Sequence, residues 1–201
     1  MSRRGRFGKY GEIKRLSRLR ARPILGTPTL REERPFRGPR IHRELSFREA
    51  GEEDKGFIKV LSERLFSGYG DYGDYLPHFI GKEGAMVWIA KRGRRDIGFA
   101  IAAPVAPQDL TRFELVAIGI LPEYQGKGFG GMLLDHVIKN LTSYGAEEVL
   151  LHTGINNKPA QALFVKKGFL PVMLKKDFYG NLLIMLDHLG SPSKVYWNYY
   201  Q

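Results

Sequence analysis

The chain has no cysteine among its 201 residues. A disulfide scaffold, a thiolate metal site and a cysteine nucleophile are therefore excluded. The absence of cysteine does not indicate whether the protein's compartment is reducing or oxidising, since both tolerate it. Long hydrophobic runs are lacking as well, since a run such as residues 182–186 is far shorter than the ~20 residues that cross a bilayer. We therefore expect a soluble chain without a membrane span, and its length suits one domain with some chain to spare.

Acidic residues are scarce at the start of the chain. Residues 1–43 contain fourteen Arg or Lys against three Glu, a net charge of +11, whereas the remaining residues contain eighteen of each sign. Glycine and proline recur in the same segment, and together these features predict a flexible basic tail over residues 1–43 that is disordered in isolation.

Three roles are open for this basic tail. It is a solvated extension, an RNA or ribosome contact that neutralises phosphates, or a mitochondrial transit peptide. Transit peptides are rich in serine, and only Ser2 and Ser17 precede residue 44. No apolar run typical of a secretory signal follows the early arginines. We therefore expect a cytoplasmic protein, with the mitochondrial matrix as the alternative.

From residue 44 onward, helix-like and strand-like patterns alternate, and no internal repeat is evident. Turn-linked strands early in this region predict antiparallel neighbours, while a later strand, helix and strand predict a right-handed parallel crossover. The glycine-rich residues 67–75 are not expected to form a core element. The fold class is thus mixed α/β over residues 44–188, followed by an aromatic extension over residues 189–201. We expect strands near residues 44–48, 85–91, 96–105, 112–121, 148–153, 169–175 and 182–187, and helices over residues 52–66, 74–80, from the 126–131 glycine cluster to about 144, and 158–167.

A glycine cluster joins an apolar strand to a helix, where backbone N–H groups and the positive end of the helix favour an anion such as phosphate. Gly126, Gly128 and Gly131 fit the pattern G-x-G-x-x-G. A dinucleotide site would follow the first strand of its unit and have an acid near the end of the next strand. Glu147 and Glu148 instead lie at the beginning of that strand, and no Lys-Ser or Lys-Thr pair completes a Walker loop. Another kind of phosphate loop is therefore favoured.

The cluster also fits Q-x-x-G-x-G, with Gln125, Gly128 and Gly130. Residues 157–169 match a second pattern through Asn157, Ala160, Leu163, Gly168 and Phe169. These two signatures resemble those of the GNAT superfamily of acetyl-CoA-dependent N-acetyltransferases over about residues 44–188, and most of all the ribosomal-protein and protein N-terminal acetyltransferases. The resemblance implies a mostly antiparallel sheet of six or seven strands with a parallel β-α-β crossover at the coenzyme site.

The resemblance also implies a binding site for acetyl-CoA and no metal. The loop amides would hold the pyrophosphate, and the preceding strand would hold the pantetheine arm. Independently of the family, a Cβ at the loop glycines would restrict the backbone and block a diphosphate. Lys127 either adds charge there or is an exposed turn lysine. The implied residues are Gln125, Gly126, Lys127, Gly128, Phe129, Gly130 and Gly131 in the loop, Ile118, Gly119 and Ile120 in the strand, and Asn157 and Phe164 in the second signature.

Glu114 is the first candidate for the base that deprotonates the acceptor amine. Strand alternation predicts that it shares a face with Val116, Ile118 and Ile120, which would desolvate the carboxylate and raise its pKa. It also stands eleven residues before Gln125, a position that resembles that of the general base in several GNAT enzymes. The alternative is a solvated glutamate at a strand end.

His152 is the second candidate, because some N-terminal acetyltransferases of this family have a histidine five residues before the equivalent of Asn157. The alternative is a structural histidine. Phe164 replaces the tyrosine that is the usual proton donor of the second signature. Tyr179 would then be either the acid or, as the resemblance favours, part of the substrate site.

The loop at residues 67–75 is expected to form the substrate wall, where acids and aromatics suit a cation, unless it is simply solvated. Deprotonating an α-amine of pKa ~7.8 at pH 7 costs about 1 kcal/mol, against about 4.6 kcal/mol for a lysine. We therefore expect N-acetylation of a protein or peptide N-terminus. The alternatives are a small-molecule amine acetyltransferase and a weakly catalytic CoA- and RNA-binding module; the oligomeric state is open. The wall residues are Tyr69, Asp71, Tyr72, Asp74 and Tyr75.

Overall fold

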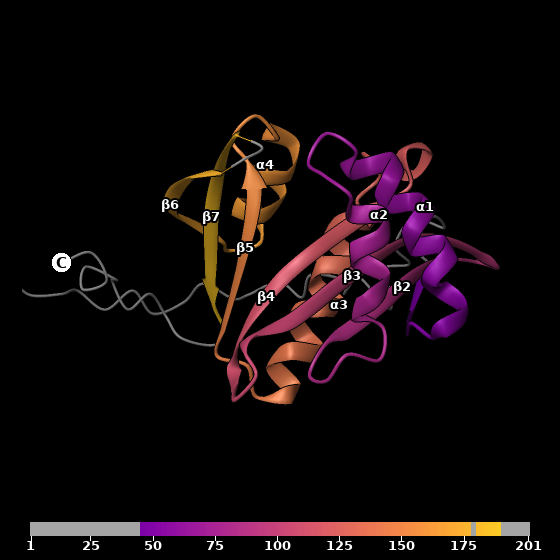
Figure 1. Cartoon of the computed structure of the whole chain (residues 1–201), viewed down its shortest axis with the longest axis horizontal. Coiled ribbons are helices and arrows are strands. Elements are labelled where there is room, and N and C mark those ends of the chain that lie inside the picture. The colour runs from indigo at the N-terminus through magenta and orange to yellow at the C-terminus, as the bar shows by residue number, and fades with distance from the viewer. Residues whose placement is uncertain (1–44, 178–179, 190–201) are drawn as a thin grey trace, which may run out of the picture. The chain divides into compact units, whose positions relative to one another are not determined.

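The computed structural model of the protein describes residues 45–177 and 180–189, which form one seven-stranded sheet with helices on both faces (Figure 1). No helix in these residues is long and apolar enough to span a membrane. In chain order the elements are β1 (Leu45–Glu49), η2 (Glu52–Asp54), α1 (Lys55–Phe66), α2 (Tyr72–Tyr75), η3 (Leu76–Phe79), β2 (Met86–Arg92), β3 (Arg95–Ala106), β4 (Asp109–Ile120), η4 (Pro122–Tyr124), α3 (Phe129–Tyr144), β5 (Glu148–Gly154), α4 (Lys158–Lys166), β6 (Leu170–Asp177) and β7 (Gly180–His188), where η denotes a 3₁₀ helix.

The strands follow the order β1-β2-β3-β4-β5-β7-β6 across the sheet. Every neighbouring pair is antiparallel except β4 and β5, which are parallel and connected through α3. The prediction of a mostly antiparallel sheet of six or seven strands with one parallel crossover is therefore confirmed. The expectation that residues 67–75 contain no core element is wrong at their end, because Tyr72–Tyr75 form α2 and Gly73 is buried.

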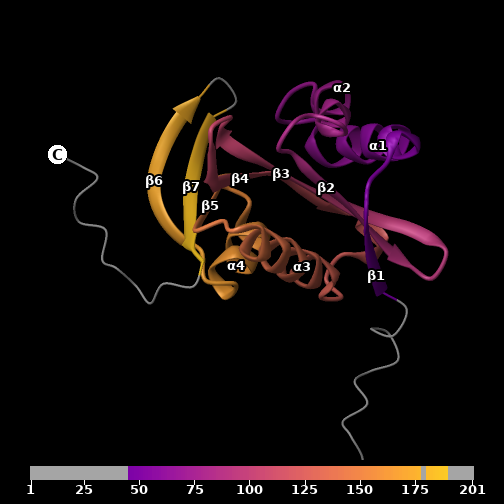
Figure 2. The same ribbon diagram turned by 90° about the horizontal axis from the view of Figure 1, so that it is seen from below.

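Each face of the sheet has its own hydrophobic core. Figure 2 shows α1 and α2 on one face and α3 and α4 on the other. On the α3 face, Leu133, Leu134, Val137 and Leu141 recur at helical spacing and are fully buried. The α1 face is built around Ile58 and Leu61 of α1, with Leu76, Phe79, Ile89, Phe99 and Ile101 packed around them.

A β-bulge reverses the side-chain alternation of β4 at Val116. Ile101 of β3 pairs with Ala117, and the next residue, Ala102, pairs with Leu115, so Val116 is the extra residue of β4. Before the bulge, Leu115 faces the α3 core, and after it Ala117 faces the α1 core. The bulge therefore changes which residues of β4 share a face.

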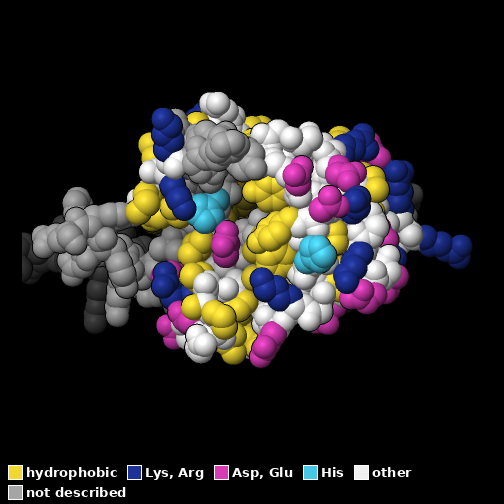
Figure 3. Space-filling model, viewed as in Figure 1, with side chains coloured by type: hydrophobic (Ala, Val, Ile, Leu, Met, Phe, Trp, Pro, Cys, Tyr) yellow, Lys and Arg dark blue, Asp and Glu magenta, His cyan; other side chains and the backbone are white. Residues whose placement is uncertain are grey.

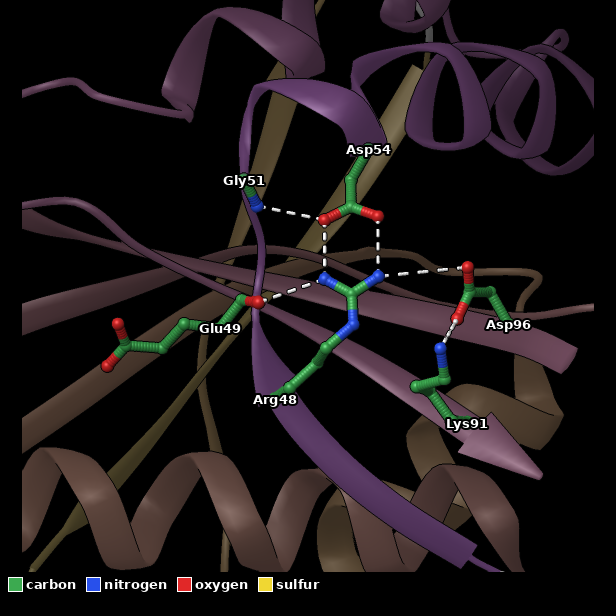
Figure 4. A network of polar contacts seen from close by, with 6 residues as sticks. All are labelled: Arg48, Glu49, Gly51, Asp54, Lys91 and Asp96. Atoms are coloured by element: carbon green, nitrogen blue, oxygen red, sulfur yellow. Dashed lines mark hydrogen bonds and ion pairs between the residues drawn. The ribbon is translucent and has the colours of Figure 1, made fainter. Parts of the chain in front are cut away.

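An ion-pair network fastens the start of α1 to the sheet (Figure 4). The guanidinium of Arg48 in β1 donates two hydrogen bonds to the Asp54 carboxylate, at 2.6 and 2.7 Å. The backbone N–H of Gly51 donates a third, at 2.8 Å. Arg48 also lies 3.8 Å from Asp96, which in turn pairs with Lys91 at 3.2 Å. The Asp54 side chain is only 4% exposed, so its charge depends on these donors.

The hydrogen bonds from Arg48 hold the pKa of Asp54 below its usual value. Asp54→Asn should therefore lower the free energy of unfolding at pH 7 by about 2 kcal/mol, because charge-assisted hydrogen bonds are lost at a buried position. Since the folded-state pKa is depressed, this contribution is complete above the unfolded value near ~4 and is lost as the pH falls through the folded value. Urea unfolding at several pH values would measure both effects.

Asp74→Asn is the matched control, because Asp74 pairs with Lys59 at 2.5 Å at an exposed site and its pKa is likewise lowered by that hydrogen bond. Solvent screens this pair, so its loss should change stability much less. Equal losses in the two variants, or a loss at Asp54 that persists at pH 2, would contradict the assignment.

Candidate active site

A cavity of about 460 Å³ opens on the α1 face of the sheet. In Figure 3, hydrophobic side chains gather in its centre with a histidine and an acidic side chain close by. Helical segments of the α1 face, the C-terminal part of β3, the middle of β4, the end of β5 and β6 contribute to it. Its lining residues are Phe66, Tyr69, Tyr72, Tyr75, Phe79, Lys82, Ala103, Pro104, Glu114, Val116, Ala117, His152, Thr153, Gly154, Asn157 and Lys175.

The cavity lies where β4 and β5 part. Their parallel pairing runs from Arg112 with Glu148 to Leu115 with Leu151 and then stops, although β4 continues to Ile120 (Figure 1). Within the described residues, no strand pairs with the β5 side of β4 beyond Leu115. An extended ligand would find backbone hydrogen-bonding groups there, including those of the predicted Ile118, Gly119 and Ile120 segment.

Because of the bulge, the side chains around Glu114 differ from those predicted. Glu114 pairs with Ala103 and faces the α1 side, whereas Ile118 and Ile120 belong to the core on the α3 side. The prediction that Ile118 and Ile120 share a face with Glu114 is therefore wrong, since strict alternation fails across Val116. Val116 itself lines the cavity together with Glu114, as predicted. The Glu114 side chain keeps 37% of its surface exposed, so these isoleucines do not shield it from water.

Glu114 and His152 meet in the cavity although they come from different strands. Nδ1 of His152 lies 3.0 Å from Oε1 of Glu114, within hydrogen-bond distance. Glu114 is in register with Leu150 of β5, and His152 lies two residues further along, on the same face. If the carboxylate accepts from Nδ1–H, then Nε2 of the neutral ring is left as a proton acceptor. The two predicted catalytic residues thus form one unit.

The glycine turn lies at the end of β4, where α3 begins. Gly126 and Gly128 have φ of +70° and +85°, and added Cβ atoms would find no atom within 4 Å. Their backbones therefore border open space, in a conformation that favours glycine. No side chain caps the start of α3, and Nε2 of Gln125 donates to the carbonyl of Ile120 at 2.8 Å, which anchors the turn to β4. The turn is suited to a phosphate group.

The other predicted residues of the turn have structural contacts. The Phe129 side chain is 1% exposed, so only its backbone faces the turn, and Gly130 and Gly131 lie against Leu163 of α4. Lys127 donates to the carbonyl of Glu123 at 2.6 Å and lies 5.6 Å from the Tyr124 ring centroid.

Arg95 adds positive charge beside the turn. It lies over the same Tyr124 ring at 5.4 Å and pairs with Glu123 at 2.9 Å. Residues 92–95 carry only the signal of a polar hairpin turn, so Arg95 was not predicted as a site residue.

The second signature contributes less to the cavity than predicted. Asn157 lines it and also caps α4, with Oδ1 accepting from the N–H of Ala160 at 3.3 Å. Phe164 is 5% exposed and packs on Phe169, with ring centroids 5.8 Å apart, in the core on the α3 side. Its ring does not line the cavity.

The predicted substrate wall divides into two groups. Tyr69, Tyr72 and Tyr75 line the cavity, and Tyr69 approaches β5 so closely that a Cβ on Gly154 would lie 3.0 Å from its hydroxyl. Asp71 and Asp74 do not line it, and Asp74 pairs with Lys59 instead. Tyr179 lies outside the described residues. In the part of the chain that is described, no group of three or more His, Asp or Glu side chains is arranged to hold a metal ion.

The fold is shared with solved acetyltransferase structures. The ribosomal-protein-S18-alanine N-acetyltransferase from Escherichia coli matches with a TM-score of 0.65 at 20% identity, over 75% of this chain and 97% of that one. A GNAT family acetyltransferase from Elizabethkingia anophelis, solved with acetyl-CoA bound, matches with a TM-score of 0.62 at 16% identity, over 73% and 99% of the two chains.

Sequence comparison then identifies the family. The profile of the acetyltransferase (GNAT) family matches residues 55–169. A protein from Haemophilus influenzae named [ribosomal protein bS18]-alanine N-acetyltransferase is 40% identical over 83 residues, which is 41% of this chain and 53% of that protein. An N-alpha-acetyltransferase from Saccharolobus solfataricus is 34% identical over 76 residues, 37% and 46% of the two chains. The chain spans about half the length of these curated relatives, and it belongs to the GNAT family of acetyltransferases.

Gly128→Ala tests the turn as the anion site. The substitution should weaken acetyl-CoA binding by about tenfold in calorimetry. The left-handed backbone at residue 128 orients the N–H groups of the turn, and this conformation is strained for alanine. Gly145→Ala is the matched control, since Gly145 ends the same helix with φ of +101° and equally open surroundings. Both variants should lose about 1 kcal/mol of stability. Equal acetyl-CoA affinity in the two variants would exclude the glycine turn as the anion-binding site.

Proposed function

We propose that the protein transfers acetyl from acetyl-CoA to the α-amine of a protein or peptide. The hydrogen bond between Glu114 and His152 inside the cavity carries this proposal, because it joins a proton acceptor to a group that orients it. The cavity adjoins the free edge of β4, and β4 leads directly to the glycine turn. A coenzyme along that edge would present its acetyl group near the pair.

The proton path begins at the acceptor ammonium, which must become a neutral amine before it attacks. Glu114 accepts Nδ1–H of His152 and stabilises the ring when it becomes charged, while Nε2 takes the proton of the amine. An imidazole suits this task because its class titrates near neutral pH. The product thiol has a pKa near ~8.5 by analogy with cysteine, so the thiolate leaves without a strong acid, and Phe164 in place of tyrosine is compatible with the reaction.

The cavity lining supports a peptide N-terminus more than a polyamine. Glu114 is the only carboxylate of the described residues that lines it, and that carboxylate is engaged by His152. Aromatic rings make up much of the remaining wall, and they suit a peptide end. The names of the two relatives, an N-alpha-acetyltransferase and a ribosomal-protein alanine acetyltransferase, agree with such an acceptor.

His152→Gln should lower kcat/KM by about 100-fold on a panel of N-terminal peptides, because the proton acceptor is removed. Glu114→Gln should lower it by only about tenfold, since the amide oxygen still accepts from the ring but its charge is lost.

His78→Gln is the matched control, because His78 is exposed and does not line the cavity. Its kinetics should equal those of the wild type. A larger loss at Glu114 than at His152 would make the carboxylate the base, and absence of turnover by the wild type on every peptide would refute the proposed activity.

We also propose a cytoplasmic protein whose residues 1–43 bind RNA or the ribosome, on the basis of their net charge of +11. Single-stranded RNA affinity should fall roughly fifty-fold between 50 and 200 mM salt if four phosphates are neutralised. Deletion of residues 1–43 should abolish the binding in fluorescence anisotropy and leave peptide acetylation unchanged. Undiminished affinity of the shortened chain would exclude this role.

A further inference from the structure

Two lysines border the cavity, and the proposed chemistry uses neither. Lys175 lies in β6, the edge strand of the sheet beyond β5 and β7, whereas Lys82 lies in the segment between η3 and β2. They are separated widely in the sequence, and only the folded sheet brings them to one site.

Both lysines are exposed, and neither has an ion-pair partner among the described residues. The Lys82 ammonium lies 4.7 Å from the centroid of the Phe79 ring, which is itself part of the cavity wall. Elsewhere in the same part of the chain, Lys59, Lys91 and Lys167 each pair with an aspartate. Lys82 and Lys175 therefore bring to the cavity two ammonium groups that form no ion pair with a described carboxylate.

The one carboxylate of the wall offsets at most one of these two positive charges. Glu114 accepts a hydrogen bond from His152 in the proposed catalytic form, and the two aspartates of residues 67–75 lie outside the lining. The cavity thus combines aromatic walls with two available ammonium groups. Such a surface attracts an anionic group and repels a second cation on the acceptor.

We propose that Lys82 and Lys175 form a specificity subsite for a carboxylate on the acceptor, so that the preferred substrate is a peptide amine followed closely by Asp or Glu. The inference rests on the proposed function and narrows its acceptor. Residues two and three of an extended peptide lie roughly 3.5 to 7 Å beyond the amine, and lysine stems are long and flexible enough to reach them. The lysines favour binding of a negatively charged acceptor and take no part in proton transfer.

The test uses two peptides that differ only by Asp or Asn at residue two, with acetyl-CoA saturating. The wild type should favour the Asp peptide roughly fivefold in kcat/KM, a ratio typical of exposed charge pairs, and high salt should reduce it. The double variant Lys82→Met, Lys175→Met should bring the ratio of the two kcat/KM values close to one. Lys176→Met is the matched control, since Lys176 is the exposed neighbour of Lys175 in β6 and does not line the cavity.

Calorimetry of both peptides with the CoA-loaded protein gives a second readout that does not depend on turnover. If no peptide is acetylated but the Asp peptide still binds more tightly in a lysine-dependent way, the proposed function fails and the subsite stands. Acetylation of both peptides with equal kcat/KM by the wild type overturns the subsite and leaves the function intact. A raised KM for acetyl-CoA in the double variant, with an unchanged peptide ratio, also overturns it, because the lysines would then serve the coenzyme.

Discussion

The candidate active site depends on the point at which β4 and β5 stop pairing. A sheet normally satisfies both edges of an internal strand, and here the pairing ends at Leu115 with Leu151 while β4 continues. Below this point the parallel register holds Glu114 and His152 on one face, close enough to form a hydrogen bond. Above it, the backbone of β4 is available to a ligand and leads directly to the glycine turn. The end of β4–β5 pairing therefore sets both the position of the Glu114–His152 pair and the start of the unpaired β4 backbone that is available to a ligand.

Much of the fold could be predicted because the signals are local. The apolar spacing of α3 and the glycines at its two ends define the helix, and the apolar runs of β2 and β3 with the polar turn between them define a hairpin. The glycine turn was predictable for the same reason, since its function depends on backbone geometry that few residue types adopt. The strand-helix-strand pattern also predicted the parallel crossover, and the family signatures then identified it as the expected coenzyme site.

The surroundings of the candidate catalytic residues Glu114 and His152 were harder to predict. An extra residue in β4 leaves no mark in its sequence, because Val116 has the same character as its neighbours. Alternation therefore grouped Glu114 with Ile118 and Ile120, which face the opposite core. Asp74 was assigned to the acceptor because a loop sequence does not reveal that Lys59 of α1 will neutralise it. Such pairings arise only after the elements have packed.

The position of β7 has a consequence for the order of folding. This strand is the last of the described chain, yet it lies between β5 and β6 and pairs with both. During synthesis from the N-terminus, the sheet from β1 to β4 can assemble early, but β5 lacks its second neighbour until β7 has been made. The strand that holds His152 thus gains its second neighbour only after β7 has been synthesised, so the candidate active-site cavity cannot be complete before then.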